Sequence, residues 1–440
     1  MTQSISSKML KKLCAIATVG TSIEWYDFYI YGTASALVFP TLFFPSSLPP
    51  LAALLAAFST FAVGFIARPV GGILFGHFGD RLGRKKALVS ALVLMGIGTA
   101  LIGALPSYDK IGVLAPLALI FLRFLQGLAI GGQWGGAILL VVESAPQNRR
   151  GFYGSFAQIG VCFGLAFANI AFFIASSQLS QEDFVSWGWR IPFVLSIALV
   201  FVAIYAHVKL EDSPIFRELQ EQQERKVAPA LGVKRSPVLE AIRLHPRQIV
   251  LAVGAFMALQ VAFFIVVTFV VAYGSNPATL AIPRSQMLIA VLIGAIFMLP
   301  SVMLSAAFSD RHGRRGIYMT ATALLMVWSF VLFPLIETKS FPLIVLGMTV
   351  EFIIMGMIHG PHGAFMSELF GTKVRYSGAS LGYQGGAILG GGFAPLIATA
   401  LLAQFGTSLA ISVYIALACG VTLLSVFLLE ETHKKDLHAT

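Results

Sequence analysis

GHFGDRLGRKK at Gly76–Lys86 and AAFSDRHGRRG at Ala306–Gly316 contain the same pattern, D-R-x-G-R followed by a basic residue. A second pattern, a glutamate followed at a fixed interval by an arginine, also occurs twice, as Glu143 with Arg150 and as Glu368 with Arg375. Landmarks that recur at similar spacing are the signature of an internal duplication. We therefore expect two related halves.

The composition indicates a membrane protein. The chain has 440 residues, of which 57% are hydrophobic and 11% are charged, whereas soluble proteins carry about 25% charged residues. A hydrocarbon core about 30 Å thick needs about 20 apolar residues per helical span. Runs of this kind predict twelve transmembrane helices, near residues 13–38, 52–77, 87–105, 113–140, 153–175, 188–208, 248–273, 287–307, 317–336, 341–366, 377–401 and 408–429.

The distribution of basic residues sets the expected orientation. The net charge is +10, but the basic residues gather in alternate loops, which argues against a nucleic-acid partner. If the N-terminus is cytoplasmic, the opposite side receives only Lys110, Arg190, Arg284 and Lys339. Cytoplasmic loops are enriched in Lys and Arg, so both termini are expected in the cytoplasm.

One long polar stretch divides the chain. Residues 209–247 include IFRELQEQQERK, which reads as an amphipathic surface helix. We therefore expect an all-α fold with a six-helix bundle over 1–208, a cytoplasmic linker over 209–247 and a second six-helix bundle over 248–440. Bundles repeated in this way rock against each other around a substrate site near the midplane. The three cysteines lie apart, so neither a metal site nor a disulfide is expected.

The repeated loops resemble the major facilitator superfamily, whose signature is matched by Gly76, Asp80, Arg81, Gly83, Arg84 and Lys85. In the second half, Ala306 departs by replacing the first glycine. More narrowly, GTSIEWYDFYIYG, LRFLQGLAIGGQWGGA, WGWRIPF and ELFGTKVRYSGASLGYQ resemble the metabolite:proton symporter family. Its members carry shikimate, α-ketoglutarate, citrate, or proline and betaine. The resemblance implies transport by alternating access and does not identify the substrate.

Two acidic residues in the first span are candidates for proton coupling. Glu24 and Asp27 are three residues apart on one helical face, with Tyr31 one turn further on. A rise of about 1.5 Å per residue places Glu24 about 16 Å from the cytoplasmic end. Charged groups inside a membrane are costly, so each one is a functional candidate. The alternative is a structural salt bridge to an arginine of the second or fourth span.

Arg123 is the candidate for binding a substrate carboxylate. It lies at a similar depth in the fourth span, and a guanidinium binds carboxylates through two parallel hydrogen bonds. The alternative is that Arg123 only pairs internally with Glu24 or Asp27. Arg68 is a further charge in the second span. The other candidates for lining the substrate site are Tyr31, Gln126, Gln133, Trp134, Gln260, Tyr383 and Gln384.

The tenth span holds a possible proton relay. Glu351 occupies nearly the position there that Arg123 occupies in the fourth span, and His359 and His362 follow in HGPHG. Histidine titrates near neutral pH, so these side chains are candidates for carrying protons. The alternative is that both histidines satisfy backbone groups freed by a kink at Pro361.

Charged residues at the cytoplasmic ends of the spans are candidates for gating. In the superfamily that the chain resembles, the loop aspartate ties neighbouring helix ends together in one access state. Glu143 with Arg150 and Glu368 with Arg375 are expected to form related latches. The full set of gating candidates is Asp80, Arg81, Arg84, Glu143, Arg150, Asp310, Arg311, Arg314, Glu368 and Arg375.

These features together predict a proton-coupled symporter of a small organic acid in the bacterial inner membrane, functional as a monomer. Uptake of a proline- or betaine-like zwitterion, and coupling to Na⁺, are alternatives. No enzyme is expected, because no HExxH, GxSxG or Cys/His cluster is present, and no cofactor beyond the coupling proton is expected. A membrane-embedded sensor is the alternative outside transport, but the short termini leave little room for an output domain.

Overall fold

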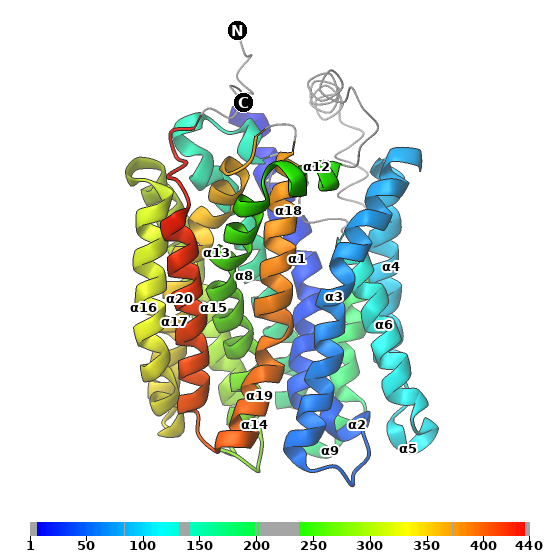
Figure 1. Cartoon of the computed structure of the whole chain (residues 1–440). Helices are drawn as coiled ribbons and strands as arrows, with labels where there is room; N and C mark the ends of the chain where they lie inside the picture. Colours follow the sequence, from blue (N-terminus) through cyan, green and yellow to red (C-terminus); the bar gives the residue numbers. More distant parts are fainter. Residues whose placement is uncertain are drawn as a thin grey trace.

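The computed structural model of the chain is a bundle of long, roughly parallel helices (Figure 1). It describes residues 7–82, 84–131, 141–198, 201, 237–371 and 374–435, with the side chains of 7–8, 76–88 and 237–239 outside that description. Helix α1 begins and helix α20 ends at the same end of the molecule, the upper end in Figure 1. Which end faces the cytoplasm stays a prediction.

The first half of the chain contributes a set of helices before residue 199. Their bounds are α1 Ser7–Leu37, α2 Phe39–Leu42, α3 Pro50–Leu82, α4 Arg84–Ala104, α5 Tyr108–Ile111, α6 Leu114–Gly131, η1 Gln147–Arg149, α8 Arg150–Gln178, α9 Gln181–Ser186 and η2 Gly188–Arg190. Helix continues from η2 through residues 191–198. Most of the predicted linker, residues 209–236, lies outside the described residues.

The second half begins with a short amphipathic helix and continues with long apolar ones. The bounds are α12 Pro237–Leu244, α13 Pro246–Phe264, η4 Ile265–Phe269, α14 Val270–Ser275, α15 Arg284–His312, α16 Arg314–Glu337, α17 Phe341–Glu368, α18 Arg375–Gly386, η5 Ala387–Gly392, α19 Ala394–Phe405 and α20 Leu409–Leu428. Both η4 and η5 are π-helical turns, which often mark functional sites.

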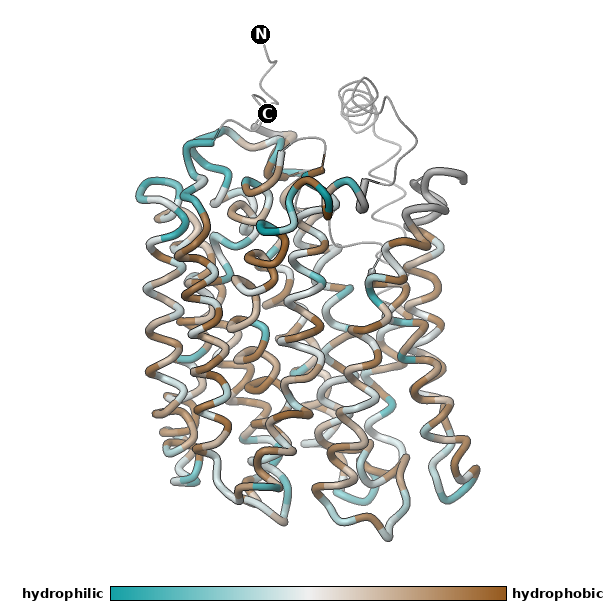
Figure 2. Tube along the Cα trace, viewed as in Figure 1, coloured by the Kyte–Doolittle hydropathy of each residue, from teal (hydrophilic) through white to brown (hydrophobic). Residues whose placement is uncertain are grey.

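Hydropathy follows the expected pattern for a membrane protein. Figure 2 shows hydrophobic residues along the middle of the helices and hydrophilic residues towards the two ends. Among the described residues, nine helices are long and apolar enough to cross a membrane, and shorter apolar helices cover Val89–Ala104 and Gly188–Ala198. With α1, which carries Glu24 and Asp27, these match the twelve predicted spans. The predicted all-α fold is confirmed.

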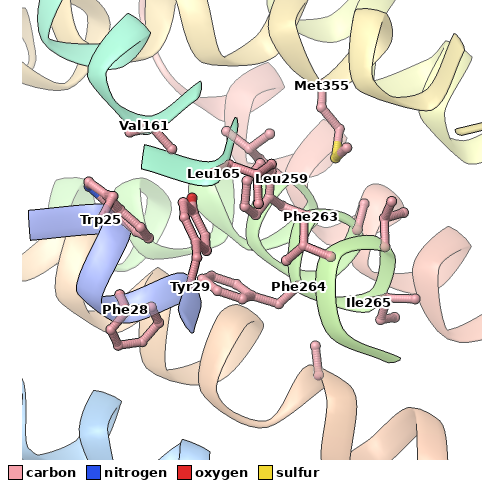
Figure 3. Packing of buried hydrophobic residues seen from close by; sticks show 14 of the residues in the cluster. Trp25, Phe28, Tyr29, Val161, Leu165, Leu259, Phe263, Phe264, Ile265 and Met355 are labelled. Carbon is pink, nitrogen blue, oxygen red and sulfur yellow. The ribbon is translucent and has the colours of Figure 1, made fainter. Parts of the chain in front are cut away.

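Helices from the two halves of the chain pack directly against each other. Helix α8 contacts α1 in its own half and also contacts α15 and α17, while α3 contacts η5 and α19. Figure 3 shows part of this contact, where Phe264 of α13 lies beside Phe28 and Tyr29 of α1. The ring of Phe264 is 5.9 Å from that of Phe28 and 5.6 Å from that of Phe61 on α3. An aromatic layer therefore joins the halves close to the buried charges described below.

Candidate functional site

The two acids of α1 lie inside the protein. Glu24 is 8% exposed, Asp27 is 1% exposed and Tyr31 is fully buried. Asp27 Oδ2 accepts a hydrogen bond of 3.2 Å from the Thr99 hydroxyl on α4, and Oδ1 has no partner. The Tyr31 hydroxyl is hydrogen-bonded to Thr60 at 2.7 Å, so Tyr31 presents its ring rather than its hydroxyl to the charged groups.

A chain of hydrogen bonds links Asp27 to Arg123. Gln126 Nε2 donates to the Thr99 hydroxyl at 2.6 Å, and Arg123 Nη1 donates to Gln126 Oε1 at 3.1 Å. Among the described residues, no ion pair joins Arg123 to either Glu24 or Asp27. The carboxylate and the guanidinium are therefore connected through two neutral side chains, and the direct internal salt bridge considered from the sequence is not formed.

Arg123 is held by aromatic rings. Its Cζ lies 4.1 Å from the centre of the Phe28 ring and 4.0 Å from that of Tyr31, and stacking on ring faces is favourable for a guanidinium. A Cβ atom at Gly64 would lie 2.5 Å from Arg123 Nε, so a side chain at position 64 would displace the guanidinium. Nε and Nη2 are buried and have no hydrogen-bond partner. These two donors are available for an anionic group.

Arg68 of α3 is the second buried cation. It is 1% exposed, and its Cζ lies 4.4 Å from the Phe28 ring centre and 4.5 Å from the Phe65 ring centre. Its electrostatic neighbours are Glu24 and, from the second half of the chain, Tyr383. Its Nε has no hydrogen-bond partner. Phe28 therefore lies in contact with both buried arginines.

The candidates from the second half form an aromatic and polar group that reaches Arg68 through Tyr383. The His362 ring stacks on Phe256 at 4.1 Å, and Phe256 stacks on Tyr383 at 4.6 Å. His362 Nδ1 lies 3.1 Å from the Tyr318 hydroxyl, which donates to the Ala255 carbonyl at 2.9 Å. Gln260 packs against Gly390 of η5. Gln260 Nε2 and Gln384 Oε1 are buried without partners.

His359 lies at the contact between the halves. Its Nε2 is 2.8 Å from Gln158 Oε1 of α8. Helix α17 continues through Pro361 to Glu368.

Glu351 does not join these groups. It is fully buried, neither carboxyl oxygen has a hydrogen-bond partner, and Cys419 of α20 is a neighbour. An ionised carboxylate without partners is very costly in such surroundings. The uncharged form of Glu351 is therefore the less costly one in these surroundings.

Several gating candidates meet at the end of the molecule that holds both termini. Asp310 accepts the backbone N–H groups of Gly151 and Phe152 at the start of α8, each at 2.8 Å. Arg314 pairs with Asp310 at 2.7 Å and with Glu368 at 3.2 Å. The aspartate of the second repeat thus binds a helix N-terminus of the first half, where backbone donors favour negative charge.

A second ion pair also joins the halves. Arg375 Nη1 lies 3.0 Å from Glu143 Oε1, and Arg150 Nη1 donates to the Lys435 carbonyl at 3.0 Å. The sequence led us to expect Glu143 with Arg150 and Glu368 with Arg375, but among the described residues Glu143 pairs with Arg375 and Glu368 pairs with Arg314. The expected pairing was wrong because spacing along the chain does not show which helix ends meet. Arg311 is exposed.

Some candidates fall beyond what the structure describes. Gln133 and Trp134 lie outside the described residues. The backbone of Asp80, Arg81 and Arg84 is helical, but their side chains are outside the description. Among the described residues, no group of three or more His, Cys, Asp or Glu side chains is arranged to hold a metal ion.

Three residues of the site escaped the sequence analysis: Thr99, Gln158 and Phe28. A threonine in an apolar span usually bonds to its own helix, as Thr99 also does to the Met95 carbonyl at 2.9 Å. Phe28 is one of 36 phenylalanines. The only available signal was the position of Phe28 directly after Asp27.

Comparisons with known proteins cover almost the whole chain. A family model described as "Sugar (and other) transporter" matches residues 13–440. The inner membrane metabolite transport protein YhjE of Escherichia coli (strain K12) is 40% identical over 429 residues, which cover 97% of this chain and 95% of that protein. The shikimate transporter of the same strain is 40% identical over 423 residues, which cover 94% and 93%.

A more distant relative and a solved structure extend the comparison. The proline/betaine transporter of Escherichia coli (strain K12) is 30% identical over 437 residues, covering 98% of this chain and 86% of that protein. The partially occluded inward open conformation of the xylose transporter XylE from E. coli has a TM-score of 0.74 at 19% identity, covering 98% of this chain and all of that one. This structural likeness shows the same fold.

Proposed function

Since the chain belongs to the sugar (and other) transporter family of the major facilitator superfamily, we propose that it is a proton-coupled symporter of a small carboxylate-bearing metabolite. The family makes it a multi-pass membrane transporter and not an enzyme. The carboxylate substrate and the proton are our proposal. We also propose that it lies in the bacterial inner membrane and functions as a monomer.

The observation that carries the proposal is the hydrogen-bonded chain from Asp27 to Arg123. Arg123 has two buried N–H donors without partners, and a carboxylate can accept both in a planar, bidentate pair. Asp27 is the acid at the other end of the same chain. A substrate anion bound to Arg123 and a proton bound to Asp27 would therefore influence each other through Gln126 and Thr99.

Thr99 gives this influence a physical route. Its hydroxyl has one hydrogen and two acceptors within reach, Asp27 Oδ2 and the Met95 carbonyl. An ionised Asp27 attracts that hydrogen, whereas a protonated Asp27 no longer requires it. The hydroxyl also accepts from Gln126, so its orientation acts on the amide that holds Arg123. The protonation of Asp27 would thus alter the donors that meet the substrate.

The charged end of the molecule supplies a gate for alternating access. We place the two moving bodies at residues 1–208 and 248–440, connected by the linker 209–247. The contacts of Asp310 with α8 and of Arg375 with Glu143 join these bodies at one end. They have to break when that end opens. Asp80, Arg81 and Arg84 are placed in the same role by the sequence repeat.

The relatives support an organic acid as substrate. A shikimate transporter is 40% identical to this chain over 423 residues, and shikimate carries a carboxylate. The proline/betaine transporter is less similar. A zwitterion also carries a carboxylate, so Arg123 suits either class, and the sequence identity favours the organic acid.

Uptake into proteoliposomes tests the proposal. The purified chain would be given a panel of organic acids, proline and betaine under an imposed pH gradient and, separately, a Na⁺ gradient. We expect an organic acid to accumulate with the pH gradient alone. Asp27→Asn should abolish this accumulation but keep exchange of substrate for substrate, because exchange does not require the proton to leave. Glu24→Gln serves as the comparison.

Two results would contradict the proposal. Accumulation driven only by Na⁺ would replace the proton as coupling ion. Full accumulation by both amide variants would remove Glu24 and Asp27 from coupling, and Glu351 and His359 would be the next acids and bases to examine.

A further inference from the structure

A groove beside the WGWRIPF segment, residues 187–193, lies at the end of the molecule opposite the two termini, where α9 is followed by η2 (Figure 1). Its volume is about 390 Å³. Its lining consists of one cation, one tryptophan and three aliphatic side chains: Arg190, Trp187, Ile191, Val194 and Leu195. No step of the transport cycle proposed above uses these side chains.

The aliphatic wall of the groove faces outward from the protein. Ile191, Val194 and Leu195 are exposed, and their spacing of three and four residues places them on one face of the helix that continues from η2. Apolar side chains on the outside of a membrane helix contact lipid chains, which are as apolar as leucine. Trp187 is exposed beside them, and tryptophan is enriched where acyl chains meet headgroups. The groove therefore lies at the level where a lipid changes from hydrocarbon to headgroup.

Arg190 is fixed on its inner side. Its Cζ lies 4.6 Å from the centre of the fully buried Trp189 ring. Its Nη1 donates to the carbonyls of Gly103 and Leu105, at 2.5 Å and 3.0 Å. These carbonyls lie at the C-terminal end of α4, where a cation is favourable. The contact with α4 by itself gives Arg190 a structural role.

Two N–H groups of Arg190 exceed that structural role. Among the described residues, Nη1 makes both hydrogen bonds of Arg190, and no acid forms an ion pair with it. Nε and Nη2 therefore have no partner in that part of the chain. These two nitrogens form one edge of the guanidinium, which can bind a phosphate through two parallel hydrogen bonds. The groove lining contains no acid, so it offers nothing to the cation of a zwitterionic headgroup.

We propose that an anionic phospholipid binds in this groove, with its phosphate on Nε and Nη2 of Arg190 and an acyl chain along the three aliphatic side chains. The net negative charge of its headgroup balances the guanidinium. Because Arg190 also holds the end of α4, the bound lipid stabilises the junction between α4 and the helix after η2. The inference concerns a lipid, so it is independent of the substrate and the coupling ion proposed above.

The fluorescence of Trp187 tests the proposal on the full-length chain. The protein would be reconstituted in phosphatidylcholine with brominated acyl chains, which quench nearby tryptophans, and unbrominated phosphatidylglycerol would be added in steps. The difference between the parent and Trp187→Phe isolates the signal of this tryptophan. We expect phosphatidylglycerol to be preferred over phosphatidylcholine at Trp187 by about fivefold, the effect of one basic residue on an anionic lipid.

Two kinds of variant should abolish this preference. Arg190→Gln removes the cation, and Arg190→Lys should restore only part of the preference because lysine lacks the planar edge. Since Arg190→Gln also removes the bonds to α4, Val194→Phe fills the groove and leaves Arg190 in place. Its matched control is Val327→Phe, at a similarly exposed position of α16, which should keep the preference. Thermal unfolding of each variant shows whether it is folded.

Three outcomes would overturn the inference. The first is equal recovery of Trp187 fluorescence with both lipids in the parent protein. The second is a preference for phosphatidylglycerol that survives in folded Arg190→Gln or in Val194→Phe, because other basic residues would then cause it. The third is Trp187 fluorescence that brominated lipid does not reach, and light scattering would then show whether a second copy of the chain covers the groove.

Discussion

His359 Nε2 lies 2.8 Å from Gln158 Oε1, and this hydrogen bond joins α17 to α8 across the two halves of the chain. Because an amide oxygen only accepts, the histidine nitrogen is the donor. Both side chains are buried, at 5% and 2% exposure. In the alternating access proposed above, this buried bond has to break and re-form in each transport cycle.

A double-mutant cycle measures this bond. His359→Ala and Gln158→Ala should each lower the free energy of unfolding. The loss in the double variant should be about 1 kcal/mol smaller than the sum of the two single losses. His362→Ala serves as the control, since His362 lies on the same helix and contacts Tyr318 instead. Its effect should add to that of Gln158→Ala. Simple additivity of His359→Ala and Gln158→Ala would show that the contact contributes nothing.

Thr99→Val should uncouple substrate binding from pH. Valine keeps the shape of threonine but cannot bridge Asp27 and Gln126. We expect about a tenfold loss of substrate affinity, corresponding to one lost hydrogen bond, and a weaker dependence of that affinity on pH. Thr99→Ser should behave like the parent protein. Binding measured across a pH series checks both expectations.

A matched threonine controls for burial. Thr322 is fully buried in α16 and bonds only to the Tyr318 carbonyl among the described residues. Thr322→Val should therefore leave the pH dependence unchanged. A parent-like pH profile for Thr99→Val would remove Thr99 from the coupling route.

Arg123→Lys should weaken substrate binding despite the retained charge. Lysine lacks the planar edge that pairs with a carboxylate and stacks less well on Phe28 and Tyr31. Gly64→Ala tests the same geometry without touching the charge, because a Cβ atom there would meet Arg123 Nε. We expect both variants to raise the dissociation constant by about tenfold or more. Unchanged affinity in Arg123→Lys would exclude Arg123 from the binding site.

Glu431 makes the terminal network sensitive to acid. Partial burial opposes its ionisation, but the backbone N–H groups of Arg314, Arg315, Thr432 and His433 donate to the carboxylate and hold its pKa below the ordinary 4.5. A depressed pKa stabilises the folded state above pH 4.5, and this stabilisation is lost as the pH falls through the folded-state pKa.

The Glu431→Gln variant should therefore unfold at a lower temperature than the parent at pH 7. The gap in unfolding temperature between Glu431→Gln and the parent should narrow as the pH falls below about 4.5. Thermal unfolding of the solubilised protein over this range measures it. Glu430→Gln, at the exposed neighbouring position, should show no such gap. A gap for Glu431→Gln that stays constant with pH would assign the loss to packing rather than to charge.

Much of the architecture followed from the sequence. Twelve apolar runs predicted the helices, because every backbone group inside a bilayer must be satisfied within a helix. The repeated D-R-x-G-R loops indicated two related halves. The same reasoning singled out Glu24, Asp27 and Arg123, since charges are rare inside membrane helices.

The partners of those charges were decided by the tertiary structure. Helical period places Glu24 and Asp27 on one face, but it does not say that Thr99 and Gln126 lie between Asp27 and Arg123, or that one phenylalanine contacts both arginines. Likewise, Arg375 meets Glu143 and not Glu368, because the rotation and contact of helices from different halves determine which ends come together. Sequence spacing constrains contacts within a helix, whereas packing between helices depends on the shapes of all the side chains at their interface.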